Sequence, residues 1–262
     1  MSIKLSLIST RPFYVDFYRF LNEHRADVSL VQVVDPQSSG QDLGELALGV
    51  KSGLLVSGNG SLPYMSDLKP DVVATFLPPS IPLTAYARAA IAARAAFLNI
   101  GLQSSKEFVE AFKESRLPIA GDYLIAQLDA SQVLDRLLNT IKEKGLVPLS
   151  AYEIGAGGPE LSEELREKRR KDELSLIKDK ESVFMGAVEP VDFMGDRRHY
   201  YIWLEAEGPL KSRVTLDAWI KFEEGPLLCD PLLGALSAIY ESKIKGEIGP
   251  VKTLAPFFKR PL

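Results

Sequence analysis

The sequence is short of residues that many functions require. It has one cysteine, Cys229, and two histidines, His24 and His199, among 262 residues. One cysteine excludes a framework of intrachain disulfides and thiolate zinc sites of the usual composition, and favours a reducing, cytoplasmic location. Neither histidine has another histidine or a cysteine three or four residues away, so no metal site is predicted and both are interpreted as surface or core residues.

Charge and hydrophobicity exclude two further classes of partner. The formal net charge is −4, which leaves no basic stripe for a nucleic-acid backbone. The basic run at 166–171 lies among glutamates and is predicted to be a solvated helix face. No apolar run approaches the roughly 20 residues that cross a bilayer, and the first residues do not look like a signal peptide. The predicted partners are therefore neither nucleic acid nor membrane.

Glycine is absent from the beginning of the chain, and the first one is Gly40. Residues 3–9, 12–24 and 28–34 predict a strand, a helix and a strand. In dinucleotide-binding sheets, glycines in the turn after the first strand let the backbone approach the pyrophosphate. Here the turn is STRPFY at 9–14, which predicts weak or absent dinucleotide binding. Thr10 and Arg11 are candidates to hold a phosphate instead. The alternative is that Pro12 starts the helix and Arg11 faces water.

Asp35 follows the second strand of this β-α-β unit. An acidic residue at that place holds ribose hydroxyls in dinucleotide-binding sheets. An aspartate before Pro36 is equally typical of a turn. Both interpretations stay open.

The middle of the chain alternates short apolar strands with helices. Strands are predicted at 71–77, 95–100 and 117–122, and helices at 83–96 and 106–115. This order is typical of a parallel sheet covered on both faces. Ligands of such sheets bind beyond the carboxyl ends of the strands, where Pro78, Gly101 and Asp122 fall.

The second half of the chain has a different texture. Helices are predicted at 127–144, 160–180 and 227–243, and strands at 147–154, 182–191, 199–206 and 211–223. The last two strands alternate in the way of an antiparallel sheet with one wet face. One apolar face of the sheet at 182–223 is not explained by its own helices, so we expect a homodimer or homotetramer.

Six motifs occur in the order in which one family carries them. TFLPPS at 75–80 corresponds to N-Y-L-P-V-G-S, AFLN at 96–99 to A-F-V-N, and LPIAGDYLIAQ at 117–127 to L-P-I-A-G-D-D-I-K-S-Q. GQDLGEL at 40–46, YEIGAGGP at 152–159 and the chain end from GPVK to FKRP are similar to further family motifs. The chain thereby resembles the myo-inositol-1-phosphate synthases, as a divergent member of the short archaeal and bacterial type.

The resemblance implies a fold of class α/β with two parts. A Rossmann-like parallel-sheet domain is expected at 1–121 and an α+β domain with an antiparallel sheet at 122–226. The segment 227–262 is expected to return to the first domain.

The resemblance also implies chemistry. Family members convert glucose 6-phosphate to inositol phosphate with NAD, which carries the hydride, and lysines stabilise the oxyanions. The implied catalytic residues are Lys178, Asp196, Arg198 and Lys243. The implied cofactor contacts are Thr10, Arg11, Asp35, Pro78 and Asp122.

Three functions remain open at this stage. The first is the NAD-dependent synthase reaction, favoured by Asp35, Asp122, Lys178 and Arg198. The second is a non-catalytic oligomeric relative that binds a nucleotide or sugar phosphate. The glycine-free turn favours it, as does Ile125, which stands where the family has a lysine. The third is a simple dehydrogenase. We expect weak or no synthase activity.

Overall fold

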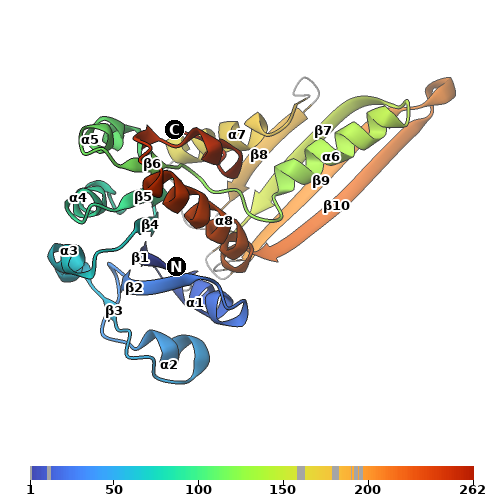
Figure 1. Ribbon diagram of the computed structural model, residues 1–262. Coiled ribbons are helices and arrows are strands. Elements are labelled where there is room, and N and C mark those ends of the chain that lie inside the picture. The colour runs from blue at the N-terminus through green and yellow to red at the C-terminus, as the bar shows by residue number, and fades with distance from the viewer. Residues whose placement is uncertain are drawn as a thin grey trace. The chain divides into compact units, whose positions relative to one another are not determined.

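The computed structural model describes residues 2–10, 13–157, 163–178, 183–189, 191, 194 and 197–262 (Figure 1). The predicted site residues Arg11 and Asp196 lie outside this set. The chain forms two compact units. Unit 1 contains Met1–Ile125 and Leu228–Leu262, and unit 2 contains Ala126–Leu227. Each is described by itself.

Unit 1 is built on a seven-stranded sheet in which every pairing is parallel. The strand order is β11-β6-β5-β4-β1-β2-β3. The strands are β1 Ile3–Ser9, β2 Val28–Val34, β3 Val56–Ser57, β4 Val72–Phe76, β5 Ala96–Asn99, β6 Pro118–Ala120 and β11 Gly249–Pro250.

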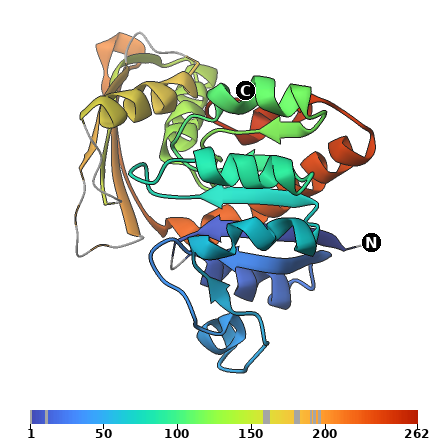
Figure 2. The ribbon, with the colours of Figure 1, turned by 90° about the vertical axis from the view of Figure 1, so that its left-hand side faces the viewer.

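Helices cover both faces of this sheet. They are α1 Phe13–Glu23, α2 Leu43–Leu48, α3 Met65–Leu68, α4 Thr84–Ala92, α5 Val109–Glu114 and α8 Glu224–Ile244. Short 3-10 helices span Asn59–Tyr64, Lys106–Phe108 and Lys252–Phe257. Helices α3, α4 and α5 lie on one face, and α1 and α8 on the other (Figures 1 and 2). Strands β4 and β5 are mostly apolar and almost wholly buried, because both of their faces are covered.

Unit 2 is a four-stranded mixed sheet in the order β10-β9-β7-β8. The strands are β7 Val147–Ala156, β8 Val183–Glu189, β9 Arg197–Glu207 and β10 Arg213–Glu223. The helices are α6 Ala130–Glu143 and α7 Glu163–Ser175. Apolar side chains of α6, including Leu134 and Leu138, pack with Ile202 and Leu204 of β9 in the core.

The predicted fold class is confirmed, with one difference in strand direction. Strands β7, β9 and β10 pair antiparallel, as expected. Strand β8 instead runs parallel to β7. A parallel neighbour requires a crossover connection, and α7 lies between the two strands in the sequence.

Candidate functional site

The carboxyl ends of β4, β5 and β6 are joined by a buried polar network. Thr75 Oγ1 donates to Asn99 Oδ1 at 3.1 Å, and Asn99 Nδ2 donates to Asp122 Oδ1 at 2.8 Å. The Asp122 carboxylate also accepts from the backbone N–H and the hydroxyl of Ser105. All four residues are buried. Three motifs that are far apart in the sequence therefore meet at one place. The Asp122 carboxylate holds the loop after β5 through its hydrogen bonds with Ser105.

Pro78 lies beside this network and accepts a hydrogen bond through its backbone carbonyl. Its carbonyl accepts from Gln103 Nε2 at 2.8 Å, and the same amide donates to the carbonyl of Ile81 at 2.6 Å. Gln103 in turn is tied to Asn99, whose Nδ2 donates to its carbonyl at 2.7 Å. The loops after β4 and β5 are thus fixed to each other at the edge where ligands of parallel sheets bind.

The C-terminal tail fastens the segment after β6. Backbone hydrogen bonds link Asp122 with Arg260 in both directions, and the Lys259 N–H donates to the Tyr123 carbonyl at 2.9 Å. The Lys259 ammonium lies 4.5 Å from the centre of the Tyr123 ring. The FKRP motif at the chain end therefore fixes the backbone around Asp122.

Asp35 lies at the end of β2 and is buried. Its Oδ1 accepts from the Gln37 N–H at 2.9 Å, a turn-type contact that fixes the carboxylate. Nearby, Tyr86 on α4 donates to Asn59 Oδ1 at 3.0 Å. Burial raises the pKa of Tyr86, the Asn59 hydrogen bond opposes this, and the Asp35 charge raises it further. Of the two interpretations of Asp35, the turn contact is present in the structure, and the ribose contact stays a prediction.

Aromatic packing occupies the start of α1, where dinucleotide-binding proteins have a glycine-rich turn. Phe13 and Tyr14 are buried. The Phe13 ring meets Phe76, at the end of β4, edge to face with centroids 4.7 Å apart. Thr10, just before the undescribed pair 11–12, is half-buried and its carbonyl accepts from the Ser9 hydroxyl. The described residues of this turn, Ser9, Thr10, Phe13 and Tyr14, include no glycine, the residue that lets a backbone approach a pyrophosphate closely.

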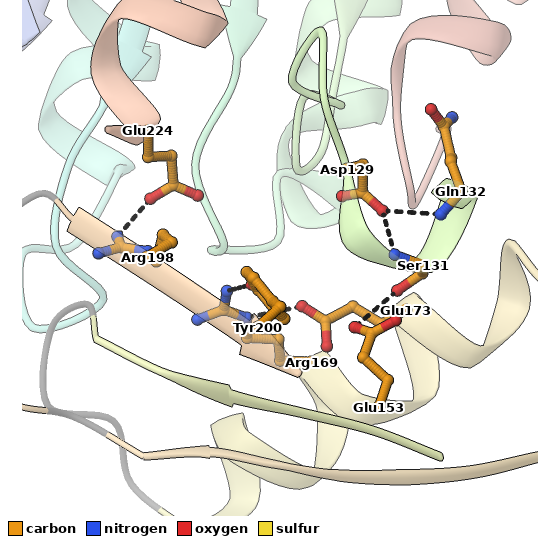
Figure 3. A network of polar contacts seen from close by, with 9 residues as sticks. All are labelled: Asp129, Ser131, Gln132, Glu153, Arg169, Glu173, Arg198, Tyr200 and Glu224. Carbon is orange, nitrogen blue, oxygen red and sulfur yellow. Dashed lines mark hydrogen bonds and ion pairs between the residues drawn. The ribbon is translucent and has the colours of Figure 1, made fainter. Parts of the chain in front are cut away.

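Unit 2 holds a second buried polar cluster (Figure 3). Arg169 on α7 pairs with Glu173 at 3.0 Å and donates to the Tyr200 hydroxyl at 2.9 Å. On neighbouring elements, the Ser131 hydroxyl donates to Glu153 Oε1 at 3.2 Å. Figure 3 also shows Asp129 capping α6, where Oδ1 accepts from the N–H groups of Ser131 and Gln132.

The prediction that the basic run at 166–171 is a solvated helix face is wrong for Arg169. Arg169 is 5% exposed, so the run is not a wholly solvated face. The missed signal was the spacing of Arg169 and Glu173, which are four residues apart on α7 and are both buried. That interval marks one side of a helix.

The three predicted catalytic cations that the structure describes have different surroundings. Lys178 is exposed just past α7, where its backbone N–H donates to Asp135. Arg198 is buried on β9 and pairs with Glu224. Lys243 Nζ donates to the carbonyl of Asp71 at 3.0 Å, and burial lowers its pKa while Asp71 opposes this. Asp71 precedes β4, so Lys243 lies at the amino edge of the sheet, opposite Asp35, Pro78 and Asp122.

The residues that the structure describes carry neither a metal site nor a membrane span. They include no group of three His, Cys, Asp or Glu placed to bind a metal ion. Within the same residues, every helix is too short or too polar to cross a lipid bilayer.

Comparison with known proteins finds sequence relatives at low identity. No model of a protein family matches it. An uncharacterized protein of Mycobacterium leprae is 24% identical over 208 residues, covering 71% of this chain and 55% of that protein. The inositol-3-phosphate synthase of Corynebacterium glutamicum is 24% identical over 213 residues, covering 71% and 58%. The chain is thus similar in sequence, at 24% identity, to an inositol-3-phosphate synthase.

The chain spans little more than half the length of these curated relatives. Solved structures share its fold over the whole chain. Ari2 has a TM-score of 0.77 at 21% identity, and a myo-inositol-1-phosphate synthase-related protein of Thermotoga maritima has 0.76 at 15%. Each match covers 100% of this chain and 93% of the other. The resemblance to the synthase family and the Rossmann-like fold are therefore confirmed.

Proposed function

We propose that this relative of the inositol-3-phosphate synthases binds a nucleotide through Asp35 and does not turn over as a synthase. The observation that carries the proposal is the position of Asp35, a buried carboxylate fixed at the carboxyl end of β2. A carboxylate at this place in a parallel sheet accepts hydrogen bonds from ribose hydroxyls. NAD is the ligand class that the fold supports, and the aromatic packing of Phe13 lowers its affinity.

The arrangement of cations supports the absence of synthase chemistry. Oxyanion stabilisation needs cations preorganised in one site. Lys178 is exposed, Lys243 lies at the amino edge of the sheet, and Ile125 replaces a family lysine. The buried cations described in unit 2 include Arg169 and Arg198, each paired with a carboxylate. Arginine holds anions but does not donate a proton at neutral pH.

A second candidate is the synthase reaction itself, with glucose 6-phosphate as substrate and NAD as cofactor. Burial of Arg198 favours it, because the resemblance puts a catalytic lysine at that position. In either case we propose a cytoplasmic protein, in keeping with the single buried Cys229.

Calorimetry with NAD and with ADP-ribose tests nucleotide binding. Asp35→Ala is expected to weaken both ligands about tenfold or more, because two charge-assisted hydrogen bonds to ribose are lost. Asp27→Ala is the matched control, since Asp27 is an exposed aspartate at the other end of the same strand. Asp35→Asn, which keeps an acceptor for the turn, separates loss of binding from loss of folding. No binding by the natural chain, or equal binding by Asp35→Ala, refutes the role of Asp35.

A separate assay tests the synthase reaction. The natural chain is incubated with glucose 6-phosphate and NAD, and inositol phosphate is measured. We expect no turnover. Robust turnover that falls about a hundredfold or more in Arg198→Ala would establish the second candidate instead.

A further inference from the structure

Three segments of unit 1 meet at the carboxyl end of β2. The first is the segment that follows β2, where the Asp35 N–H donates to the carbonyl of Ser57 at 2.8 Å. Ser57 ends β3, so the loop after β3 begins beside Asp35. The third segment is α4, whose Tyr86 hydroxyl donates to Asn59 Oδ1 at 3.0 Å. Burial and the nearby Asp35 charge both raise the pKa of Tyr86. Asp35, Asn59 and Tyr86 therefore lie close together at the edge of the sheet where ligands bind.

The loop after β3, residues 58–61, is fixed by hydrogen bonds to the sheet. Gln32 of β2 donates from Nε2 to Ser61 Oγ at 3.1 Å, and its Oε1 accepts from the Ser6 hydroxyl of β1 at 2.9 Å. Gln32 and Ser6 are both buried. Ser61 Oγ donates in turn to the carbonyl of Gly58 at 2.8 Å. The loop therefore holds its shape before any ligand arrives, which lowers the entropic cost of binding.

Asn59 presents an oriented amide on this loop. Its side chain is exposed, whereas Tyr86, which donates to its Oδ1, is 2% exposed. The Tyr86 hydroxyl takes one lone pair of Oδ1, so a second lone pair and the N–H groups of Nδ2 remain. Among the described residues, none accepts a hydrogen bond from Asn59 Nδ2. An acceptor and a donor side by side match adenine, whose N6 amine donates and whose neighbouring ring nitrogen accepts.

The turn after β1 offers less to the phosphates of a dinucleotide. In dinucleotide-binding sheets the pyrophosphate lies at this turn. Residues 9–14 contain no glycine, so the close backbone approach that the usual turn provides is missing. Phe13 and Tyr14 are buried there, and the Phe13 ring packs on Phe76. The described side chains thus offer polar contacts to a base and a ribose, and apolar rings near the place of the pyrophosphate.

We infer that the site at Asp35 takes adenosine rather than a dinucleotide, and that Asn59 is the residue that reads the base. Asn59 Oδ1 accepts from the adenine amine, and Nδ2 donates to the ring nitrogen beside it. Asp35 accepts from the ribose hydroxyls. The inference rests on the proposed role of Asp35 and narrows its ligand class, because the base and the ribose carry the binding and the phosphates add little.

Inosine is the analogue that this arrangement should reject. Its base has a carbonyl oxygen in place of the amine, so two acceptors, this oxygen and Asn59 Oδ1, would face each other. The hydrogen bond from Tyr86 holds the amide in the orientation that suits adenine. A site that hydrogen-bonds one group of its ligand discriminates strongly against an analogue that lacks this group.

Isothermal titration calorimetry of the full chain with adenosine, inosine and NAD tests the inference. We expect adenosine to bind within about threefold of NAD, and inosine to bind about tenfold or more weakly than adenosine. Asn59→Ala should weaken adenosine to the level of inosine and leave inosine within about twofold. Tyr86→Phe, which frees the amide, should reduce the discrimination about threefold or more. Asn22→Ala, at an exposed asparagine of α1, is the matched control and should change neither affinity.

Each outcome decides the inference. NAD that binds more than about tenfold tighter than adenosine overturns the preference for adenosine. Equal binding of adenosine and inosine, or discrimination that survives Asn59→Ala, overturns the role of Asn59. Asp35→Ala should weaken adenosine and inosine alike, whereas Asn59→Ala weakens adenosine only. Adenosine that binds Asp35→Ala and the natural chain equally refutes the proposed function, and leaves the ratio of adenosine to inosine as the test of Asn59. No binding of any of the three ligands refutes both.

Discussion

Asn99 and Asp122 meet at the ends of adjacent parallel strands, with 2.8 Å between Asn99 Nδ2 and Asp122 Oδ1. Each belongs to a different sequence motif, and each is buried. Because Ser105 also donates to Asp122, the pair fixes the loop that follows β5. The pair therefore fixes the shape of this edge of the sheet.

Asp122→Asn should destabilise the protein by about 2 kcal/mol. The carboxylate accepts from Asn99 and from two groups of Ser105. The asparagine amide offers one acceptor oxygen and turns its NH₂ group toward a donor. Buried hydrogen bonds to a charged group contribute about 1.5 to 3 kcal/mol, and part of this contribution is lost in the variant. Urea unfolding at pH 7 measures the loss. Asp67→Asn, at an exposed position, should cost less than about 0.5 kcal/mol, and equal losses would contradict the buried network.

Asp42 should make stability depend on pH in the acid range. It caps α2, and hydrogen bonds from the backbone of Ser52, Glu45 and Gly53 hold its pKa at about 2, below the ordinary 3.8. The contribution is complete above pH 3.8 and is lost as the pH falls through about 2. The difference in urea midpoint between the natural chain and Asp42→Asn should therefore shrink as the pH falls from 6 toward 2. A difference independent of pH would contradict this assignment.

Phe13→Ala should destabilise the protein by about 3 kcal/mol, because it leaves a cavity beside Phe76. Grafting the glycine turn of the family onto residues 9–14 removes both Phe13 and Tyr14, so it carries this cost as well. Denaturant unfolding measures both changes. Phe13→Leu, which keeps most of the volume, is the control, and a cost below about 1 kcal/mol for Phe13→Ala would show that the ring is not part of the core.

The sequence predicted the longer strands of the parallel sheet better than its two-residue strands. The apolar runs of β1, β2, β4, β5 and β6 are visible because both faces of a parallel sheet are buried. Strands β3 and β11 have two residues each, too few for any periodicity. The direction of β8 was missed because alternation reports which face is wet and says nothing about which neighbour a strand joins.

The candidate site was predicted unevenly for a similar reason. Asp35 and Asp122 were predicted as cofactor contacts because position after a strand is readable in the sequence, and the structure shows that both follow strands. The contact between Arg169 and Tyr200 joins residues 31 apart in sequence, so no local sequence pattern predicts it. Lys243 was placed by motif order alone, and only the fold shows that its partner Asp71 lies just before β4, whereas Pro78 lies after it.

Mutation of the ion pair between Arg198 and Glu224 can distinguish a structural role of Arg198 from a functional one. Arg198 is 4% exposed and its guanidinium meets the Glu224 carboxylate. Arg198→Met leaves the Glu224 carboxylate, which is 19% exposed, without this ion pair, so the variant should destabilise the protein by about 1.5 to 3 kcal/mol. Arg198→Met combined with Glu224→Gln removes both charges and should recover at least half of that loss, as measured by denaturant unfolding in a double-mutant cycle. If Arg198→Met instead leaves stability unchanged or raises it, Arg198 is held in a costly position for a ligand, as is common for residues that act on substrates. That result would favour the synthase reaction over nucleotide binding alone.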